Sequence, residues 1–411
     1  MQSESYKKPV FSRHFQFSAL EFIFWFAMAT VGYLTVFLES LGFSPTQIGR
    51  VAAINSAVGI IAAPFWGMVA DKIRSVKKVF LLCIITGSLL WALVPFTSRI
   101  SVGPIMLCLI LVPISMFFRN PANSLMDNWV VQTANRENLN YGGMRLWGSL
   151  SYAIMAISLS FILPKLGVEW TFYMLFVLIL PLFAIATAIK GDSTLQKKPI
   201  PLKEMHLEKL FRNYYYITYL IFAIALHMPT QTSNTFLPYL IKNVNGNTAQ
   251  IGMIMGYKAL LEIPMLVLLK SLRKRFPLYY LLLGAAFFYT LEAFLYSGAT
   301  SFYQIVLIST FHGLGGGLYI GTAANYVYTL APGNLKATAQ TVNGSMTAIA
   351  GIIGNLFGGM LLDAYGVVAF YRLIGFLIIG AICIYVISIL IAKYILHLPP
   401  PGQHVEHSDS F

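Results

Sequence analysis

Apolar blocks of about 20 residues recur along the whole chain and are separated by short polar segments. A block of this length spans a bilayer as an α-helix, because lipid offers the backbone no hydrogen-bonding partners outside the helix itself. Twelve such blocks are centred near residues 28, 58, 88, 117, 153, 178, 225, 259, 287, 314, 347 and 382. The pattern predicts an all-α, multi-pass membrane protein with twelve transmembrane helices and both termini on one side.

Composition and charge support this prediction and orient the chain. The 411 residues are 57% hydrophobic and 10% charged, whereas soluble domains carry about 25% charged residues. The net charge of +13 comes from short loops and does not indicate a nucleic-acid partner. With the N-terminus inside, 20 Lys and Arg residues lie on the cytosolic side and five outside, which predicts that both termini are cytosolic. The expected location is a bacterial inner (plasma) membrane. We expect no cleavable signal peptide.

A polar segment at 190–210 divides the predicted spans six and six. The expected organisation is an N-terminal bundle at 1–189, a cytosolic linker at 190–210, a C-terminal bundle at 211–396 and a cytosolic tail at 397–411. SPTQIG at 44–49 and NTAQIG at 247–252 form a repeat, with Gln47 and Gln250 offset by about half the chain. Two pseudo-symmetric six-helix bundles are a recurrent transporter architecture; a chance match of one short motif is the alternative.

The loop after the second span reads GMVADKIRSVKK and resembles the loop signature of the major facilitator superfamily. Gly67, Asp71 and Lys72 occupy matching positions, and Arg74 stands where a glycine is usual. In that family the aspartate braces the interface of the halves when the cytosolic side is closed. The resemblance therefore implies a gating role for these three residues; an ordinary positive-inside loop is the alternative.

A narrower resemblance is carried by NPANSLMDNW, NYGGMRLWGSLSYA and FHGLGGGL. These runs are similar to the branch that includes lactose permease, other oligosaccharide and nucleoside proton symporters, and phenylpropionate permease-like carriers. The resemblance implies a transporter that works by alternating access. It also implies a sugar-binding carboxylate on the fourth helix, near Ser124 or Asp127, an arginine at Arg145, and a histidine at His312.

Six ionisable residues lie inside predicted spans, namely Arg119, Asp127, Arg145, Lys258, Glu262 and Glu292. Exposing each to lipid costs roughly 3 kcal/mol, so they are expected to face protein or water. Asp127 and Arg145 flank a hairpin whose turn lies near Glu137, which makes an ion pair between them geometrically available. A purely structural salt bridge, or an Arg145 that snorkels to the surface, is the alternative.

The fourth and seventh spans supply candidate solute ligands. Arg119, Asn123 and Asp127 are four residues apart and share one helix face, which we expect to line an aqueous cavity. Arg119 would suit a carboxylate or phosphate; it could equally pair with another helix. The polar groups around Pro229 either bind solute or satisfy backbone freed by the proline. The predicted substrate-binding residues are Arg119, Asn123, Ser124, Asp127, Asn128, Arg145, Trp147, Gln231 and Asn234.

Coupling to protons requires a group that titrates within the membrane. Glu262 is the main candidate, because Lys258 lies one turn away and its movement would change the proton affinity of the carboxylate. His312 titrates in the physiological range when unperturbed, and Glu292 is the nearest charge on the ninth span. A static cluster of Lys258, Glu262, Glu292 and His312 is the alternative.

The sequence contains no GxSxG and no HExxH, so we expect no enzyme, no metal site and no cofactor other than the proton gradient. A sensor or scaffold would leave the polar helix faces unexplained. The prediction is a secondary active transporter, monomeric in the lipid bilayer, that imports a sugar or oligosaccharide, a nucleoside or an organic acid together with protons. Drug or metabolite efflux and proton-independent uniport are the alternatives.

Overall fold

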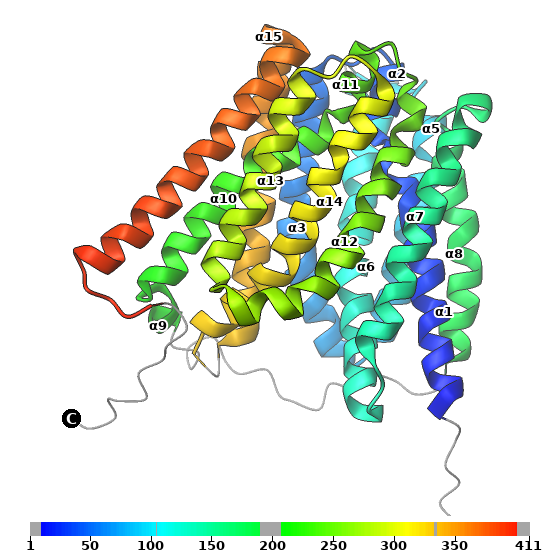
Figure 1. Cartoon of the computed structure of the whole chain (residues 1–411). Helices are drawn as coiled ribbons and strands as arrows, with labels where there is room; N and C mark the ends of the chain where they lie inside the picture. The colour runs from blue at the N-terminus through cyan, green and yellow to red at the C-terminus, as the bar shows by residue number, and fades with distance from the viewer. Residues whose placement is uncertain (1–9, 104, 190–206, 333–334, 401–411) are drawn as a thin grey trace, which may run out of the picture. The chain divides into compact units, whose positions relative to one another are not determined.

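The computed structural model of the chain describes residues 10–103, 105–189, 207–332 and 335–400 (Figure 1). These residues are almost entirely helical, apart from the two-residue strands β1 (Ser101–Val102) and β2 (Ile105–Met106), which pair antiparallel. The helices are α1 (Val10–Met28), η1 (Ala29–Tyr33), α2 (Leu34–Ser40), α3 (Pro45–Ile73), α4 (Val76–Ala92), α5 (Val94–Thr97), α6 (Leu107–Glu137), α7 (Tyr141–Leu166), α8 (Trp170–Ala188), α9 (Leu207–Phe211), α10 (Tyr214–Thr235), α11 (Leu237–Asn243), η3 (Thr248–Gln250), α12 (Ile251–Arg275), α13 (Leu278–Ser297), α14 (Phe302–Leu330) and α15 (Lys336–Tyr394).

The prediction of an all-α membrane protein is confirmed, and every predicted span centre lies within a described helix. Eight helices in the described part of the chain are long and apolar enough to cross a membrane. The 59-residue α15 contains two of the predicted centres and is interrupted at Gly366, whose φ of 73° lies in the region that favours glycine. Figure 1 shows α15 as two arms, orange and red, that join at the top of the view.

The chain divides into two compact units. The first contains residues 1–43, 57–198 and 247–260, and the second contains 44–56, 199–246 and 261–411. The start of α3 thus packs with the C-terminal helices, and the start of α12 packs with the N-terminal helices. Most of the predicted linker (190–206) and the end of the predicted tail (401–411) lie outside the described residues.

The two copies of the predicted repeat lie at the start of the segments 44–56 and 247–260. The first residues of each copy cap a helix. Ser44 and Gln47 form a capping box: Ser44 N donates to Gln47 Oε1 at 2.9 Å, and Gln47 N donates to Ser44 Oγ at 3.4 Å. In the second copy, Asn247 Oδ1 accepts a hydrogen bond from Ala249 N at 2.9 Å. The polar residues of each copy therefore cap the N-terminus of a helix.

The glycine that ends each copy permits close helix contact. A Cβ on Gly49 would overlap the carbonyl oxygen of Asn355 in α15, and one on Gly252 would overlap the carbonyl oxygen of Ala156 in α7. The α3 segment is also fixed by Asp363 of α15, whose Oδ2 accepts from Thr46 N at 2.8 Å and from the Thr46 hydroxyl. A carboxylate at this position satisfies an amide at the start of α3 and complements the helix dipole.

The loop between α3 and α4 turns through a left-handed residue. Arg74, in the usual glycine position, has a φ of 55°, and Ser75 caps α4 by accepting from Lys78 N at 3.2 Å. Lys77 Nζ donates to the carbonyl oxygens of Thr187 at 3.3 Å and Ile189 at 2.7 Å, where α8 ends. Lys77, one of the basic residues of this loop, thus has a structural role.

The predicted gating residues Gly67, Asp71 and Lys72 lie in the last two turns of α3. Asp71 and Lys72 are exposed, and a Cβ added at Gly67 would meet no other atom within 4 Å. Their gating role stays a prediction.

We predict that Gly49→Ala destabilises the protein by about 1–3 kcal/mol, because the added methyl group meets the backbone of Asn355. Gly67→Ala in the same helix should instead stabilise it by up to about 1 kcal/mol, since that position is open and alanine favours helix. Thermal unfolding of both purified variants measures the difference. Equal midpoints would contradict the close packing of α3 on α15.

We predict that Arg74→Gly raises stability by about 0.5–1 kcal/mol, because glycine adopts positive φ without steric cost. Arg74→Val should lower stability, since a β-branched residue is least suited to this conformation. The same unfolding assay orders the three proteins. A valine variant as stable as the glycine variant would show that the turn is not left-handed.

Candidate functional site

The first unit contains a group of charged and aromatic side chains on α1, α6 and α7, of which Glu21 is fully buried and the others are half-buried. Glu21 of α1 is 0% exposed, and its Oε2 accepts a hydrogen bond from Trp25 Nε1 at 3.0 Å. The guanidinium of Arg145 stacks on the Trp25 ring, with Cζ 4.2 Å from the ring centroid. Asp127 and Tyr141 complete the electrostatic surroundings of Glu21 and Arg145. These five residues are called the N-terminal polar cluster below.

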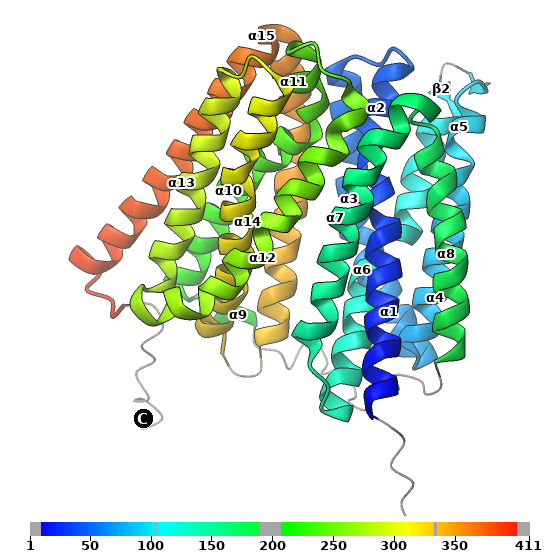
Figure 2. The ribbon, with the colours of Figure 1, turned by 45° about the vertical axis from the view of Figure 1, so that its right-hand side comes forward.

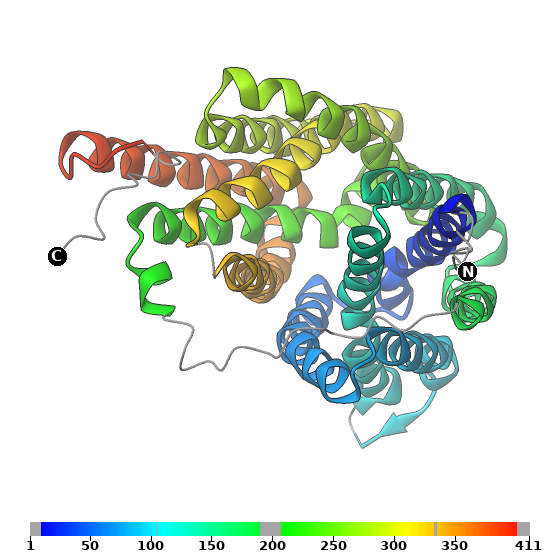
Figure 3. The ribbon, with the colours of Figure 1, turned by 90° about the horizontal axis from the view of Figure 1, so that it is seen from below.

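Helix packing and helix ends place this cluster. Figures 2 and 3 show α1 running beside α7. Asn140 caps α7 by accepting from Gly143 N at 3.1 Å, so Arg145 lies in the second turn. Arg13 Nε lies 3.6 Å from Glu137 Oε2, which ties the start of α1 to the end of α6.

The predicted ion pair between Asp127 and Arg145 is not formed directly among the described residues. The two groups interact electrostatically, but Asp127 Oδ1 and Arg145 Nη1 are both buried without a hydrogen-bond partner. The guanidinium lies instead against the ring of Trp25, which belongs to α1 and is more than a hundred residues away in sequence. The cluster therefore has two unused acceptors, Glu21 Oε1 and Asp127 Oδ1, and one unused donor, Arg145 Nη1.

Arg119 does not share an exposed face with Asn123 and Asp127, which corrects the expected cavity lining. It is 5% exposed and stacks on Trp91 of α4, with Cζ 4.5 Å from the ring centroid. Arg119 Nη2 also contacts Met116 Sδ at 2.7 Å. The alternative, that another helix binds Arg119, is what the structure shows. The other polar residues of α6, Asn123, Ser124 and Asn128, are exposed.

Trp147 lies away from Arg145, because positions two apart on a helix point about 200° apart. It is 48% exposed and packs near Phe22, with ring centroids 6.5 Å apart. The two rings line an apolar groove of about 450 Å³ on α1 and α7. Trp147 therefore lies outside the N-terminal polar cluster, and its contact with solute stays a prediction.

The polar turn of α10 shows mainly internal hydrogen bonds. Thr230 Oγ1 donates to Leu226 O at 3.0 Å, and Thr232 Oγ1 donates to Met228 O at 2.7 Å. These bonds match the structural interpretation of the residues around Pro229. Gln231 and Asn234 are half-buried, and their contact with solute stays a prediction.

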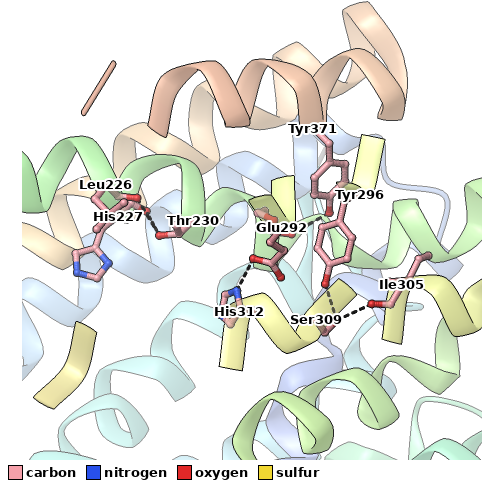
Figure 4. Close-up of polar contacts among 10 residues, drawn as sticks. Leu226, His227, Thr230, Glu292, Tyr296, Ile305, Ser309, His312 and Tyr371 are labelled. Atoms are coloured by element: carbon pink, nitrogen blue, oxygen red, sulfur yellow. Dashed lines mark hydrogen bonds and ion pairs between the residues drawn. The ribbon is translucent and has the colours of Figure 1, made fainter. Parts of the chain in front are cut away.

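The second unit contains a second buried polar group, shown in Figure 4. His312 of α14 and Glu292 of α13 point toward one another, with Nδ1 and Oε2 2.7 Å apart. Glu292 is 3% exposed. The Tyr289 ring packs edge-on against His312 at a centroid distance of 5.1 Å, and Tyr296 shares a 2.6 Å hydrogen bond with Ser309.

Glu262 of α12 joins this group through α14. Its Oε1 would lie 3.0 Å from a Cβ on Gly316, one turn beyond His312. Tyr289 interacts electrostatically with both Glu262 and Glu292. We call Glu262, Tyr289, Glu292 and His312 the C-terminal polar cluster.

Lys258 is buried at 6% exposure and lies four residues before Glu262 on α12. The two side chains therefore share one face of the helix, as the sequence predicts. The role of Lys258, Glu262, Glu292 and His312 in proton coupling stays a prediction.

Sequence reasoning missed Trp25, Tyr141 and Tyr289, and for Glu21 it did not separate a role as an interface charge from a role as a cavity residue. A usable signal did exist for two of them. Glu21 is a lone carboxylate in an apolar span, and Trp25 follows it by one helical turn. No sequence signal links either residue to Arg145.

Long apolar helices that enclose ionisable side chains indicate an integral membrane protein whose charged groups face protein or water. The chain belongs to the MFS_1 like family, whose family model matches residues 14–373. It is thus a multi-pass transporter of the major facilitator type that handles a small-molecule substrate, and not an enzyme.

Two curated relatives match nearly the full chain. The uncharacterized transporter YwbF of Bacillus subtilis (strain 168) is 24% identical over 400 residues, covering 94% of this chain and 97% of the relative. The maltose permease of Geobacillus stearothermophilus is 24% identical over 370 residues, covering 89% and 92%. Among solved structures, the nucleoside transporter NupG is similar with a TM-score of 0.75 at 16% identity, covering 93% of this chain and 99% of that chain, which shows the shared fold.

We predict that Trp25→Phe destabilises the protein by about 1–3 kcal/mol, because the buried Glu21 carboxylate loses its hydrogen-bond donor. Trp147→Phe is the matched control and should change stability by less than about 0.5 kcal/mol, since that ring is half-exposed. Thermal unfolding in detergent compares them. A Trp147 variant that loses as much stability as the Trp25 variant would contradict the assigned roles.

Proposed function

We propose that this protein imports a small polar solute together with protons by alternating access, through twelve transmembrane helices, as a monomer with both termini in the cytosol of a bacterial plasma membrane. The solute class we favour is a sugar, an oligosaccharide or a nucleoside. A maltose permease among the full-length relatives and a nucleoside transporter among the structural neighbours support this class.

The observation that carries proton coupling is the 2.7 Å contact between His312 and Glu292 inside the membrane domain. The pair holds one proton when it is an ion pair or two neutral groups, two protons when both groups are protonated and none when both are deprotonated, so a change between these counts takes up or releases a proton. Ionisable residues within membrane spans are otherwise rare and commonly mark proton relays. Tyr289 and Glu262 border the pair, so a change in either would alter which state is favoured.

The N-terminal polar cluster is the proposed solute site. Arg145 offers a planar set of donors, Asp127 offers acceptors, and Trp25 offers an aromatic face. The unused Arg145 Nη1 and Asp127 Oδ1 are a donor and an acceptor that solute hydroxyl groups would satisfy. Arg119 serves packing in this proposal, because its guanidinium is already enclosed by α4 and α6, and an organic acid is therefore the less favoured solute.

We expect proteoliposomes with an imposed inward proton gradient to accumulate radiolabelled maltose, sucrose or uridine above equilibrium. Glu292→Gln should abolish accumulation while exchange of labelled for unlabelled solute continues, because exchange needs no net proton movement. Glu169→Gln, in an exposed loop, is the control and should accumulate solute normally. Uptake that ignores the gradient and an uncoupler would make the protein a uniporter, and outward accumulation would make it an efflux carrier.

A further inference from the structure

We propose that Glu21 is a second proton-binding site of the transporter, located in the N-terminal polar cluster and controlled by Arg145. This inference rests on the proposed proton-coupled function and assigns a bound proton to a helix that the C-terminal polar cluster does not include. It follows from burial, charge count and the position of Trp25.

The first argument for a proton on Glu21 is the burial of its carboxylate. Glu21 is 0% exposed, and only one of its oxygens, Oε2, has a donor, from Trp25. Oε1 is buried without a hydrogen-bond partner. An ionised carboxylate in such a place is strongly unfavourable unless a cation compensates its charge. The side chain therefore depends on a positive neighbour or on a proton.

The second argument is the charge count. The charged groups that interact with Glu21 among the described residues are Arg145 from α7 and Asp127 from α6. Tyr141 of α7 is a further titratable neighbour, and α8, which also packs on α1, carries only Tyr173. Two carboxylates thus share one guanidinium. One negative charge is in excess, and a proton removes it.

Exposure decides which carboxylate takes the proton. Asp127 is only half-buried and lies beside the exposed Asn123 and Asn128 on α6. Its carboxylate also accepts a hydrogen bond from Tyr141, and its exposed part reaches water although Oδ1 is buried. Glu21 has no such exposure, so the proton belongs to Glu21.

Trp25 links this proton to the solute. Its indole N–H holds Glu21, and its ring face holds the Arg145 guanidinium. When a solute binds Arg145 and draws it from the ring, the positive charge near Glu21 weakens and proton binding is favoured. By linkage, a proton on Glu21 then strengthens solute binding by the same factor. The two events are coupled through one aromatic side chain.

The test uses the purified full-length chain and infrared difference spectra between about pH 5 and about pH 8, with no solute present. We expect a protonated-carboxyl C=O stretching band that is lost in Glu21→Gln and retained in Asp127→Asn. Glutamine still accepts the Trp25 hydrogen bond, so the fold should persist. If that variant does not fold, Trp25→Phe should shift the band in frequency.

A band that is unchanged in Glu21→Gln, unmoved in Trp25→Phe, or lost only in Asp127→Asn would overturn the proposal. Because the readout needs no solute, these results are independent of the transport assay. Loss of gradient-driven uptake in Glu292→Gln, together with a wild-type band that Glu21→Gln leaves in place, would keep the proposed function standing and remove only this second site.

Discussion

An ionised side chain is very costly in the apolar interior of a membrane, and the described parts of this chain are arranged around that cost. Arg119 and Arg145 are each covered by a tryptophan ring, at 4.5 and 4.2 Å. His312 and Glu292 face one another at 2.7 Å. The same condition makes these groups useful, because a charge that needs a partner responds strongly when that partner moves or is replaced by solute.

The two units stabilise their charged side chains in different ways. In the first, cations stack on aromatic faces, which neutralise nothing and leave donors and acceptors unused. In the second, a carboxylate and an imidazole share a proton position beside tyrosines. The first arrangement suits recognition of hydroxyl groups, and the second suits a change of protonation. Within the first unit, Trp25 contacts both a guanidinium and a carboxylate.

Much of the fold could be predicted from sequence, because apolar block length and helix formation are local properties. The span centres depend on near neighbours in the chain, and the repeat that precedes two spans lies at helix starts. The site was harder. Residues 21 and 145 meet only through the crossing of α1 and α7, and the burial of Arg119 depends on Trp91 from another helix. Helical periodicity places a residue on a face but does not say which ring covers it, which is why the expected direct pair of Asp127 with Arg145 was wrong.

The bond from Thr46 to Asp363 joins residues 317 positions apart. A ribosome reaches Asp363 only after most of the protein has been made. The beginning of α3 therefore enters the membrane before the carboxylate that accepts the hydrogen bond from Thr46 N has been synthesised. The final assembly of an early helix thus waits for a late one. Chains truncated before residue 363 would lack this hydrogen bond permanently.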